Sequence, residues 1–299
     1  MRRAYRAAYG GGLSSFGMRT VGRRCLDGLS ALIFLAVLSA SFSAWGGTPP
    51  RIVSLSPAVT ELVFQLGQGR FLVGRSEVCN YPKEAEAVPQ VGRYADPALE
   101  RVVKLRPTLV LTNDLRSPRA GEVLRKLGVK LIVKQCRTVG EYREWVMLLG
   151  KELDCPGEAA AELSRFDREI AELKKLEPLP VSLLWVISDS PLMTGGRRSL
   201  LSEVSQLAGM RNAGDVCDQA YFRLSRDFVL NNPPEVVIWA NSGAVPDGMV
   251  NFWGGLAAVK KGRILHYLHE DMVMRPGPRL PAGIRKMRAE VEEMMGKTR

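Results

Sequence analysis

Two acidic residues hold matching places in the two halves of this chain. Glu100 lies seven residues before Pro107, and Asp227 lies seven residues before Pro234. In both halves the proline opens a short apolar run that favours a buried strand. A carboxylate in the first turn of a helix can simply complement the helix dipole. Two carboxylates at equivalent points can also orient a protein against a partner that offers cations.

Other groups that could do chemistry are few. His266 and His269 have no third ligand at metal-binding spacing, so a structural role is favoured and no metal site is expected. Residues 195–198, Gly-Gly-Arg-Arg, could bind phosphate ahead of a helix, but a tight turn is the simpler interpretation. The sequence has no Gly-x-Ser-x-Gly elbow, His-Glu-x-x-His pair or Walker loop. We therefore expect no enzyme, and a catalyst on the same α/β framework is the rival hypothesis.

The cysteines permit disulfides. Four of them, an even number, follow the N-terminal segment, and none belongs to a Cys-x-x-Cys pair that would suggest zinc. Cys79 and Cys136 each follow an expected strand in the same half and form the favoured pair. Free buried thiols that pack as small apolar groups are an equally good interpretation.

The first 46 residues have the three parts of a secretory signal peptide. Arg23 and Arg24 precede an apolar run over 29–38, and small residues follow through Ala44. The run is shorter than the roughly 20 residues that a membrane span needs. We expect cleavage and a periplasmic location. An uncleaved segment that anchors a membrane-held sensor is the alternative.

Charge argues against nucleic acid as a partner. The net charge of the whole chain is +11, but residues 1–46 carry six arginines against one aspartate. Cleavage therefore removes nearly half of the excess. The remaining basic residues are scattered, without the aromatic-interleaved stripe of nucleic-acid binders, and favour a solvated basic surface.

After the signal peptide, short apolar runs alternate with helical patterns, which predicts parallel sheets covered by helices. For a first lobe over 47–153, strands are expected at 52–55, 72–74, 108–112 and 130–133. Its helices are expected at 58–66, 99–105, 120–127 and 139–153. For a second lobe over 179–299, strands are expected at 182–187, 235–240 and 263–267, with helices at 199–208 and 280–295. About 250 residues are enough for two lobes, each with its own core.

A long helix is expected between the lobes, within residues 154–178. Its apolar side chains recur every three or four residues and form one stripe of Leu163, Phe166, Ile170, Leu173 and Leu176. Pro156 fits its start and Pro178 its end. At 1.5 Å per residue this helix would be about 30 Å long, so it can join two lobes as a stiff strut.

Several short motifs of the first lobe together resemble a known family. They are Ser-Pro-x-x-Thr-Glu-Leu at 56–62, Tyr-Pro at 81–82, Leu-Glu-Arg-Val at 99–102 and Lys-Leu-Arg-Pro-Thr-Leu-Val at 104–110. This block resembles the solute-binding proteins of vitamin B12 and ferric-siderophore ABC importers, most of all the cobalamin-binding members. The resemblance implies class III periplasmic binding protein architecture, with two Rossmann-like lobes joined by one long helix and the ligand held between them.

The resemblance also implies site residues. Ligands of α/β sheets bind beyond the carboxyl ends of the strands. The matching positions for ligand binding are Ser56, Val78, Asn80, Tyr81, Tyr94, Phe222, Asp271 and Arg275. Glu100 and Asp227 match the acidic residues, one per lobe, that dock onto arginines of the permease, although the cobalamin-binding members have Glu at the second place.

The ligand implied is a corrinoid, with a ferric siderophore, haem or another bulky chelate as alternatives. Val78 replaces an aromatic residue of the cobalamin-binding members and Met272 replaces a tryptophan, so the aromatic lining is thinner. No cofactor is expected besides this ligand. The expected partner is the transmembrane permease of an ABC importer, and the expected oligomeric state is a monomer.

Overall fold

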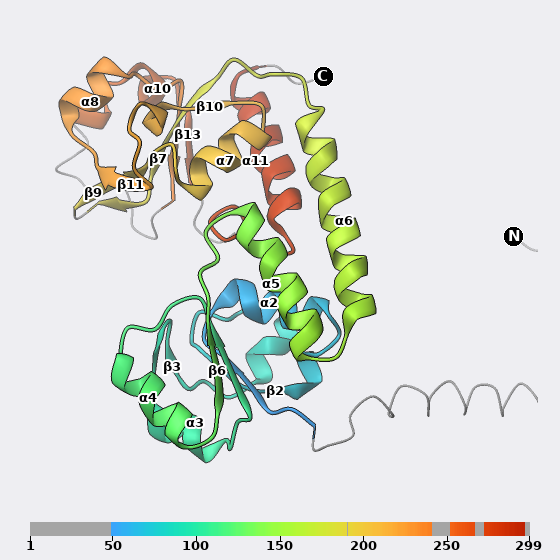
Figure 1. Cartoon of the computed structure of the whole chain (residues 1–299). Coiled ribbons are helices and arrows are strands. Elements are labelled where there is room, and N and C mark those ends of the chain that lie inside the picture. The colour runs from blue at the N-terminus through green and yellow to red at the C-terminus, as the bar shows by residue number, and fades with distance from the viewer. Residues whose placement is uncertain (1–48, 190, 241–251, 267–271, 297–299) are drawn as a thin grey trace, which may run out of the picture. The chain divides into compact units, whose positions relative to one another are not determined.

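Two four-stranded parallel sheets form the framework of the protein (Figure 1). The computed structural model describes residues 49–189, 191–240, 252–266 and 272–296. The expected signal peptide lies outside the described residues. Within them, every helix is too short or too polar to span a bilayer. The predicted class is confirmed: an α/β protein with two lobes of parallel strands and a long helix between them.

The first lobe is built on a sheet with the strand order β2-β1-β5-β6, in which all neighbours run parallel. Its strands are β1 (Ile52–Ser54), β2 (Leu72–Arg75), β5 (Leu109–Thr112) and β6 (Lys130–Val133). Its helices are α2 (Pro57–Gln65), α3 (Leu99–Lys104), α4 (Pro118–Lys126) and α5 (Val139–Glu152). Between β2 and α3 lie the short pair β3 (Gly92–Arg93) and β4 (Asp96–Pro97). Single 3₁₀ turns occupy η1 (Gly69–Phe71) and η2 (Lys83–Ala87).

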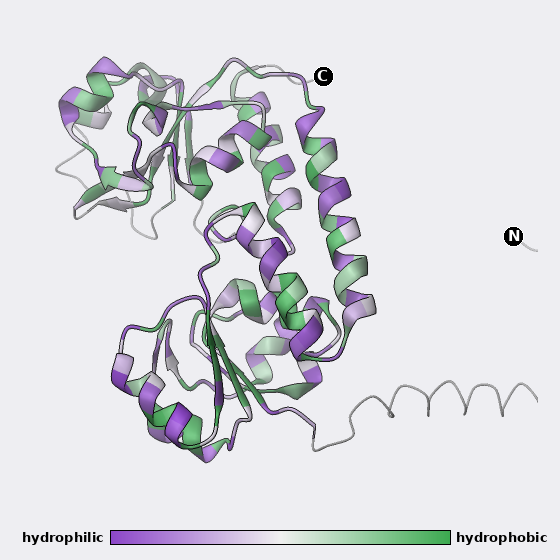
Figure 2. Cartoon of the chain, in the orientation of Figure 1, coloured by the Kyte–Doolittle hydropathy of each residue, from purple (hydrophilic) through white to green (hydrophobic). Residues whose placement is uncertain are grey.

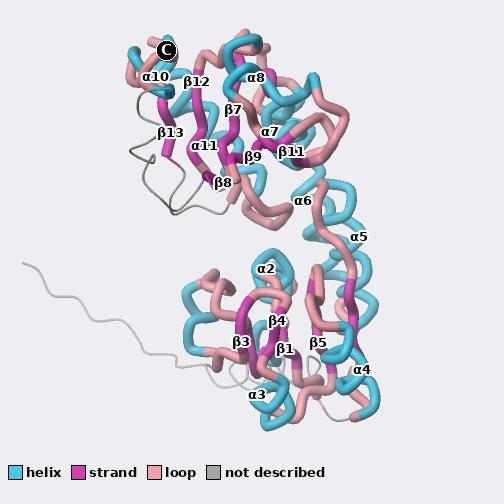
Figure 3. Tube along the Cα trace, turned by 90° about the vertical axis from the view of Figure 1, so that its left-hand side faces the viewer, coloured by secondary structure: helices cyan, strands magenta, loops and turns pink. Residues whose placement is uncertain are grey.

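The second lobe has the strand order β10-β7-β12-β13, again parallel, with β12 between β7 and β13 (Figure 3). Its strands are β7 (Ser182–Val186), β10 (Arg211–Asn212), β12 (Val236–Trp239) and β13 (Ile264–His266). Its helices are α7 (Leu200–Leu207), α8 (Arg226–Asn231), α10 (Ala257–Lys260) and α11 (Leu280–Met294).

The sequence patterns did not predict every element of the second lobe. An antiparallel sheet of β8 (Ser188–Asp189), β9 (Leu192–Gly195) and β11 (Tyr221–Arg223) adjoins the parallel one. The two-residue edge strand β10 and the 3₁₀ turn η3 (Ala213–Val216) were also missed. Such short segments show no periodicity that a sequence window can detect.

The connecting helix is α6 (Pro156–Lys174), which follows α5 and leads to the second lobe (Figure 1). It ends four residues before Pro178, where the sequence predicted its end. The expected apolar stripe is confirmed in part, because Phe166, Ile170 and Leu173 are buried. Leu163 is only half-buried, and Glu162 is buried beside the stripe instead.

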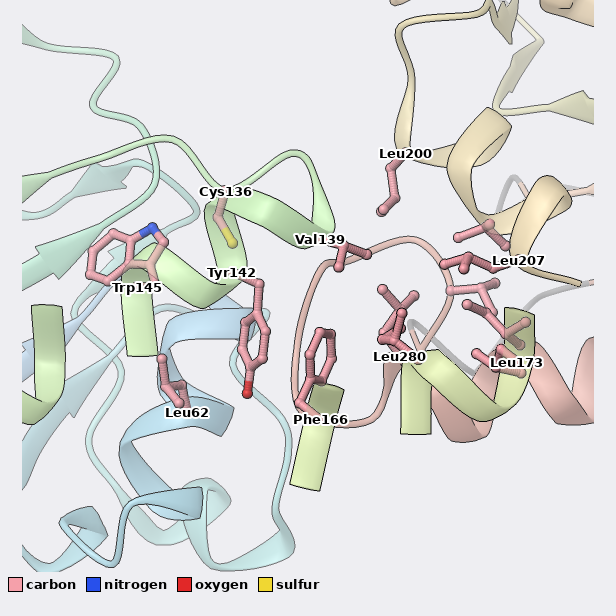
Figure 4. Packing of buried hydrophobic residues seen from close by; sticks show 14 of the residues in the cluster. Leu62, Cys136, Val139, Tyr142, Trp145, Phe166, Leu173, Leu200, Leu207 and Leu280 are labelled. Carbon is pink, nitrogen blue, oxygen red and sulfur yellow. The ribbon is translucent and has the colours of Figure 1, made fainter. Parts of the chain in front are cut away.

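The two lobes share one large hydrophobic core, contrary to the expectation of a separate core in each. It runs from α2 and α5 of the first lobe through α6 to α7 and α11 of the second (Figure 4). Leu62, Tyr142, Phe166, Leu207 and Leu280 all belong to it. Two smaller clusters lie around Val110 and Trp239, one in each lobe, and the strands carry much of this apolar surface (Figure 2). A continuous core resists separation of the lobes because opening it would expose apolar surface.

Candidate functional site

A pocket of about 400 Å³ lies at the carboxyl edge of the first sheet. Each of the four strands of that sheet leads into a segment that lines it. These segments, after β1, β2, β5 and β6, supply Pro57, Ala58, Val78, Asn113 and Cys136. Tyr94, between β3 and β4, adds an aromatic ring, and Met274, Arg275 and Pro276 reach the pocket from the second lobe. Its volume is in the range of about 300–1,000 Å³ typical of small-molecule sites.

Val78, Tyr94 and Arg275, three of the positions expected to bind a ligand, lie together in this lining. The lining also contains Asn113 and Met274, which the sequence reasoning missed. For Asn113 a signal existed, because it is the polar residue directly after the expected strand 108–112. Asp271, which the sequence reasoning paired with Arg275, lies outside the described residues.

Ser56 does not line the pocket. It has no exposed surface, and its hydroxyl oxygen accepts a hydrogen bond from the Asn113 backbone N–H at 2.7 Å. The same hydroxyl lies 3.3 Å from Oγ1 of Thr112, which is also fully buried. Ser56 is thus a positioning residue that ties the start of α2 to the end of β5.

Tyr94 is half-buried, and the charge of Arg137 acts on its pKa as well as on that of Tyr221 in the second lobe. Burial raises the pKa of the Tyr94 phenol, the charge of Asp114 raises it further and the charge of Arg137 opposes the rise. Burial also raises the pKa of Tyr221 in β11, again opposed by Arg137. Arg137 is exposed, so one accessible cation of the first lobe acts on a tyrosine of each lobe.

Phe222 lies on the other face of β11 from the exposed Tyr221, because successive strand residues point to opposite sides. Its ring packs against Phe228 with the centroids 5.2 Å apart. The neighbouring Tyr221 keeps 42% of its surface exposed. Neither Phe222 nor Tyr221 belongs to the lining of the pocket.

Tyr81 and Asn80 also lie away from the pocket lining. Tyr81 stacks on the Arg279 guanidinium, which is 3.8 Å from the ring centroid. Arg279 also donates two hydrogen bonds to the Glu61 carboxylate, at 2.8 and 2.6 Å. These residues line a separate cavity of about 680 Å³. Asn80 is exposed and lines neither cavity.

The expected disulfide is wrong in this structure, where Cys79, Cys136, Cys155 and Cys217 are all free. Cys79 is buried beside β1, with its sulfur 3.1 Å from the Ser76 hydroxyl. The Cys136 thiol instead donates to the Pro276 carbonyl of the second lobe, at 3.5 Å. Both thiols are thus free and buried, as the alternative interpretation predicted, and each also has a polar neighbour.

Glu100 and Asp227 both lie in the first turn of a helix, α3 and α8 respectively. Both side chains are exposed. In α8 the cap comes from the Ser225 hydroxyl, which accepts a hydrogen bond from the Phe228 N–H at 3.0 Å. The matching placement read from the sequence therefore extends to secondary structure and exposure.

The other motifs have structural explanations where they are described. The Gly196, Arg197 and Arg198 N–H groups donate to carbonyls of residues 217–220, so they form a turn and are not directed at an anion. His266 ends β13, and His269 lies outside the described residues. The described residues contain no His, Cys, Asp and Glu cluster able to hold a metal.

A larger cavity, about 890 Å³, lies at the opposite edge of the second sheet. It is lined by residues at the amino ends of strands, such as Ser182, Arg211 and Glu235. Glu235 there accepts a hydrogen bond from the Ser182 N–H at 2.9 Å. We favour the smaller pocket as the site because parallel sheets bind ligands at their carboxyl edge.

Solved structures of the same fold cover nearly the whole described chain. A periplasmic haem-binding protein from Roseiflexus sp. RS-1 aligns with a TM-score of 0.73 and 22% identity, over 83% of this chain and 99% of that one. The periplasmic vitamin B12-binding protein of Vibrio cholerae aligns with a TM-score of 0.66 and 23% identity, over 83% and 98%. At this identity the likeness establishes the fold.

Relatives found by sequence similarity include proteins of the same kind as these solved structures. A vitamin B12-binding protein of Photorhabdus laumondii is 30% identical over 258 residues, which cover 85% of this chain and 90% of that protein. Another, from Vibrio parahaemolyticus, is 26% identical over 250 residues, covering 83% and 91%. Residues 52–270 match the family described as periplasmic binding protein. With the fold, the pocket and the sequence in agreement, the chain belongs to the periplasmic binding protein family.

Proposed function

We propose that this chain is the extracytoplasmic substrate-binding component of an ABC importer and that its ligand is a corrinoid. The observation that carries the proposal is the pocket itself. All four strands of the first sheet lead into it, and Met274–Pro276 close it from the second lobe. A site between lobes that share a core binds a ligand with little rearrangement.

The character of the pocket supports a large, partly apolar ligand. Tyr94, Val78 and Met274 offer apolar surface, and Arg275 and Asn113 offer polar groups. A pocket of about 400 Å³ is large enough to hold one edge of a corrinoid. Relatives that carry the name vitamin B12-binding protein support the same ligand. The proposal involves binding and transport, and no chemical step.

Haem is the second candidate. A phenol oxygen can ligate ferric iron, and a cation can pair with a propionate carboxylate. Tyr94 and Tyr221 supply phenols from the two lobes, and the Arg137 charge acts on both. Several solved structures with this fold are haem-binding proteins, which favours this alternative over a siderophore.

Titration of the purified mature protein decides between the ligands. Cyanocobalamin, cobinamide, haem and ferrichrome are each added while tryptophan fluorescence is followed. We expect saturable one-to-one binding of both corrinoids. Tyr94→Ala should weaken it at least tenfold through lost ring contact, whereas Leu127→Ala, at an exposed site on the first lobe, should leave it unchanged. Binding of haem or ferrichrome without any response to corrinoids would replace the ligand and keep the transport role.

A further inference from the structure

Helices α3 and α8 have the same construction. Each is six residues long, has an exposed acid as its second residue and an exposed apolar residue as its fifth. The apolar residues are Val103, with 40% of its surface exposed, and Leu230, with 61%. Residues three apart share one face of a helix. Glu100 with Val103 and Asp227 with Leu230 thus form two acid–apolar patches, one on each lobe.

A buried valine anchors each of these helices. Val102 and Val229, directly before the exposed apolar residues, have no exposed surface. Each packs in the smaller hydrophobic cluster of its own lobe. The core of each lobe therefore takes one apolar side chain of the helix and leaves the next one in solvent. The apolar half of each patch has no packing role that would account for it.

The match between the lobes distinguishes the patches from ordinary surface. A single exposed apolar residue is common on proteins and needs no explanation. Here the same order of acid, buried valine and exposed apolar residue occurs in two helices of equal length. None of these residues lines the pocket, so contact with the ligand does not account for the match. A partner that contacts both lobes does.

The two members of a patch affect an encounter differently. An exposed carboxylate attracts a basic surface and orients it, but an exposed ion pair adds little affinity. An apolar side chain acts only on contact, where its burial removes apolar surface from water and slows dissociation. By charge and apolar complementarity, the patches fit a partner that offers a basic group beside an apolar one at each of two points.

We propose that Val103 and Leu230 are apolar anchors that hold the transmembrane permease of the importer, each beside the carboxylate that steers the encounter. This inference rests on the proposed transport function and adds the residues that set the lifetime of the complex. The carboxylates mainly determine the rate of association, and the anchors mainly determine the rate of dissociation.

The test measures the two rates separately. The ligand-free protein is passed over the ABC importer of the same cell whose ATP hydrolysis the wild type stimulates, held in lipid nanodiscs. Val103→Ser and Leu230→Ser should each raise the dissociation rate about three- to tenfold, and the double variant by about the product of the two. Association should stay within about twofold of wild type and slow equally with salt, because both carboxylates remain.

Two control variants keep these rates as in wild type. Leu230→Met preserves an apolar side chain at the same position. Met147→Ser removes a methionine of α5 that is 56% exposed. Successive residues of β1 point to opposite faces of the first sheet, and Ile52 packs in the cluster of α5 whereas Val53 packs in that of α3. Met147 therefore belongs to a helix on the other face of the sheet from α3.

Four results would overturn the inference. An unchanged dissociation rate of the double variant, with or without slower association, leaves the transport function standing. Equal binding of wild type to nanodiscs without importer assigns the patches to lipid. Self-association of wild type that the double variant loses assigns them to a second copy of this chain. A wild type that stimulates no ABC importer of the cell overturns the proposed function as well.

Folding is checked by thermal melting, and substitutions at such exposed positions should change stability little. Val103→Thr and Leu230→Gln replace any serine variant that is unfolded, with the same rates expected.

Discussion

Cys136 lines the pocket, and the burial of its thiol also affects the stability of the folded protein. The side chain is 6% exposed, and burial raises the pKa of its thiol to about 12. The thiol therefore stays protonated and unreactive at neutral pH, although it lines the pocket. Its hydrogen bond to the Pro276 carbonyl joins the segment after β6 to the second lobe.

This raised pKa predicts a pH dependence of unfolding. The folded state keeps the Cys136 proton more tightly than the unfolded chain does, so the contribution is complete below about pH 9 and is lost as pH rises toward 12. Between pH 8 and 10, wild type should lose about 1 kcal/mol more unfolding free energy than Cys136→Ala. Urea unfolding at both pH values measures this, and equal losses would show that Cys136 does not titrate as inferred.

At the residue scale the sequence predicted the site in part. Val78, Tyr94 and Arg275 follow from their motif positions, and the structure places all three in one lining. Ser56 and Phe222 lie outside this lining, for reasons that the sequence does not display. The Ser56 hydroxyl is taken up by the backbone N–H of Asn113, and the Phe222 ring packs against Phe228.

At the scale of elements, Glu162 is the centre of a buried polar network on α6. Its carboxylate accepts hydrogen bonds from Tyr142 Oη at 2.6 Å, from Gln65 Nε2 at 3.0 Å and from Arg165 at 2.8 and 2.7 Å. Arg165 in turn donates to the Pro278 carbonyl at 3.0 Å. This network connects α2, α5 and α6 with the segment before α11.

Glu162→Gln should therefore destabilise the protein by about 2–4 kcal/mol, because it removes the charge that pairs with Arg165 and leaves a buried donor badly placed. The matched control is Glu172→Gln on the same helix. Glu172 is exposed, its pKa is lowered by the hydrogen bond and charge of Lys175, and its loss should shift the unfolding midpoint little. Similar midpoints for the two variants in urea would contradict the role given to the network.

Long elements were predictable and short ones were not. The runs at 130–133 and 139–153 recur as β6 and α5 with ends within one residue. In α5 the periodicity is set by burial of one face, on which Tyr142, Val146 and Leu149 lie. The antiparallel sheet β8-β9-β11 depends on pairing between distant segments, which no local pattern reports. The buried charge of Glu162 likewise depends on its partners from α2 and α5.

At the scale of the whole molecule, a clasp of Glu61, Tyr81 and Arg279 fastens the lobes outside their common core. Glu61, in α2, has 6% of its side chain exposed, and Arg279, just before α11, has 21%. Arg279 belongs to the same short segment as Arg275 of the pocket. The clasp therefore fixes one wall of the candidate site against the other.

Breaking the clasp should weaken both stability and binding. We expect Arg279→Met to lower the unfolding free energy by about 3 kcal/mol, since it leaves the Glu61 carboxylate buried without its cation. The double variant Glu61→Met, Arg279→Met should recover part of that loss, because the unpaired charge is removed as well. Arg285→Met, at the longer and more exposed contact of 3.4 Å to Glu169, is the control with a small effect. Strictly additive losses in the double variant would exclude a coupled pair.

The docking onto a permease that we propose is the last property that belongs to the whole molecule, since it would use one carboxylate on each lobe. Glu100 and Asp227 are exposed in the first turns of α3 and α8. Charge reversal by Glu100→Arg or Asp227→Arg should leave corrinoid affinity unchanged and strongly reduce ligand-stimulated ATP hydrolysis by the reconstituted importer. The two reversals together should abolish it.

A series of salt concentrations and a matched variant distinguish docking through two specific carboxylates from an effect of overall surface charge. Exposed ion pairs are screened over a Debye length of about 10 Å at 0.1 M salt, so wild-type stimulation should fall as salt rises, while the reversed variants respond little. Glu122→Arg, an exposed acid in α4 of the first lobe, changes the net charge equally and should keep stimulation. A loss with Glu122→Arg as large as with Glu100→Arg would mean that net charge, and not two specific carboxylates, governs the encounter. Unchanged stimulation in both docking variants would reduce Glu100 and Asp227 to acids that complement their own helix dipoles.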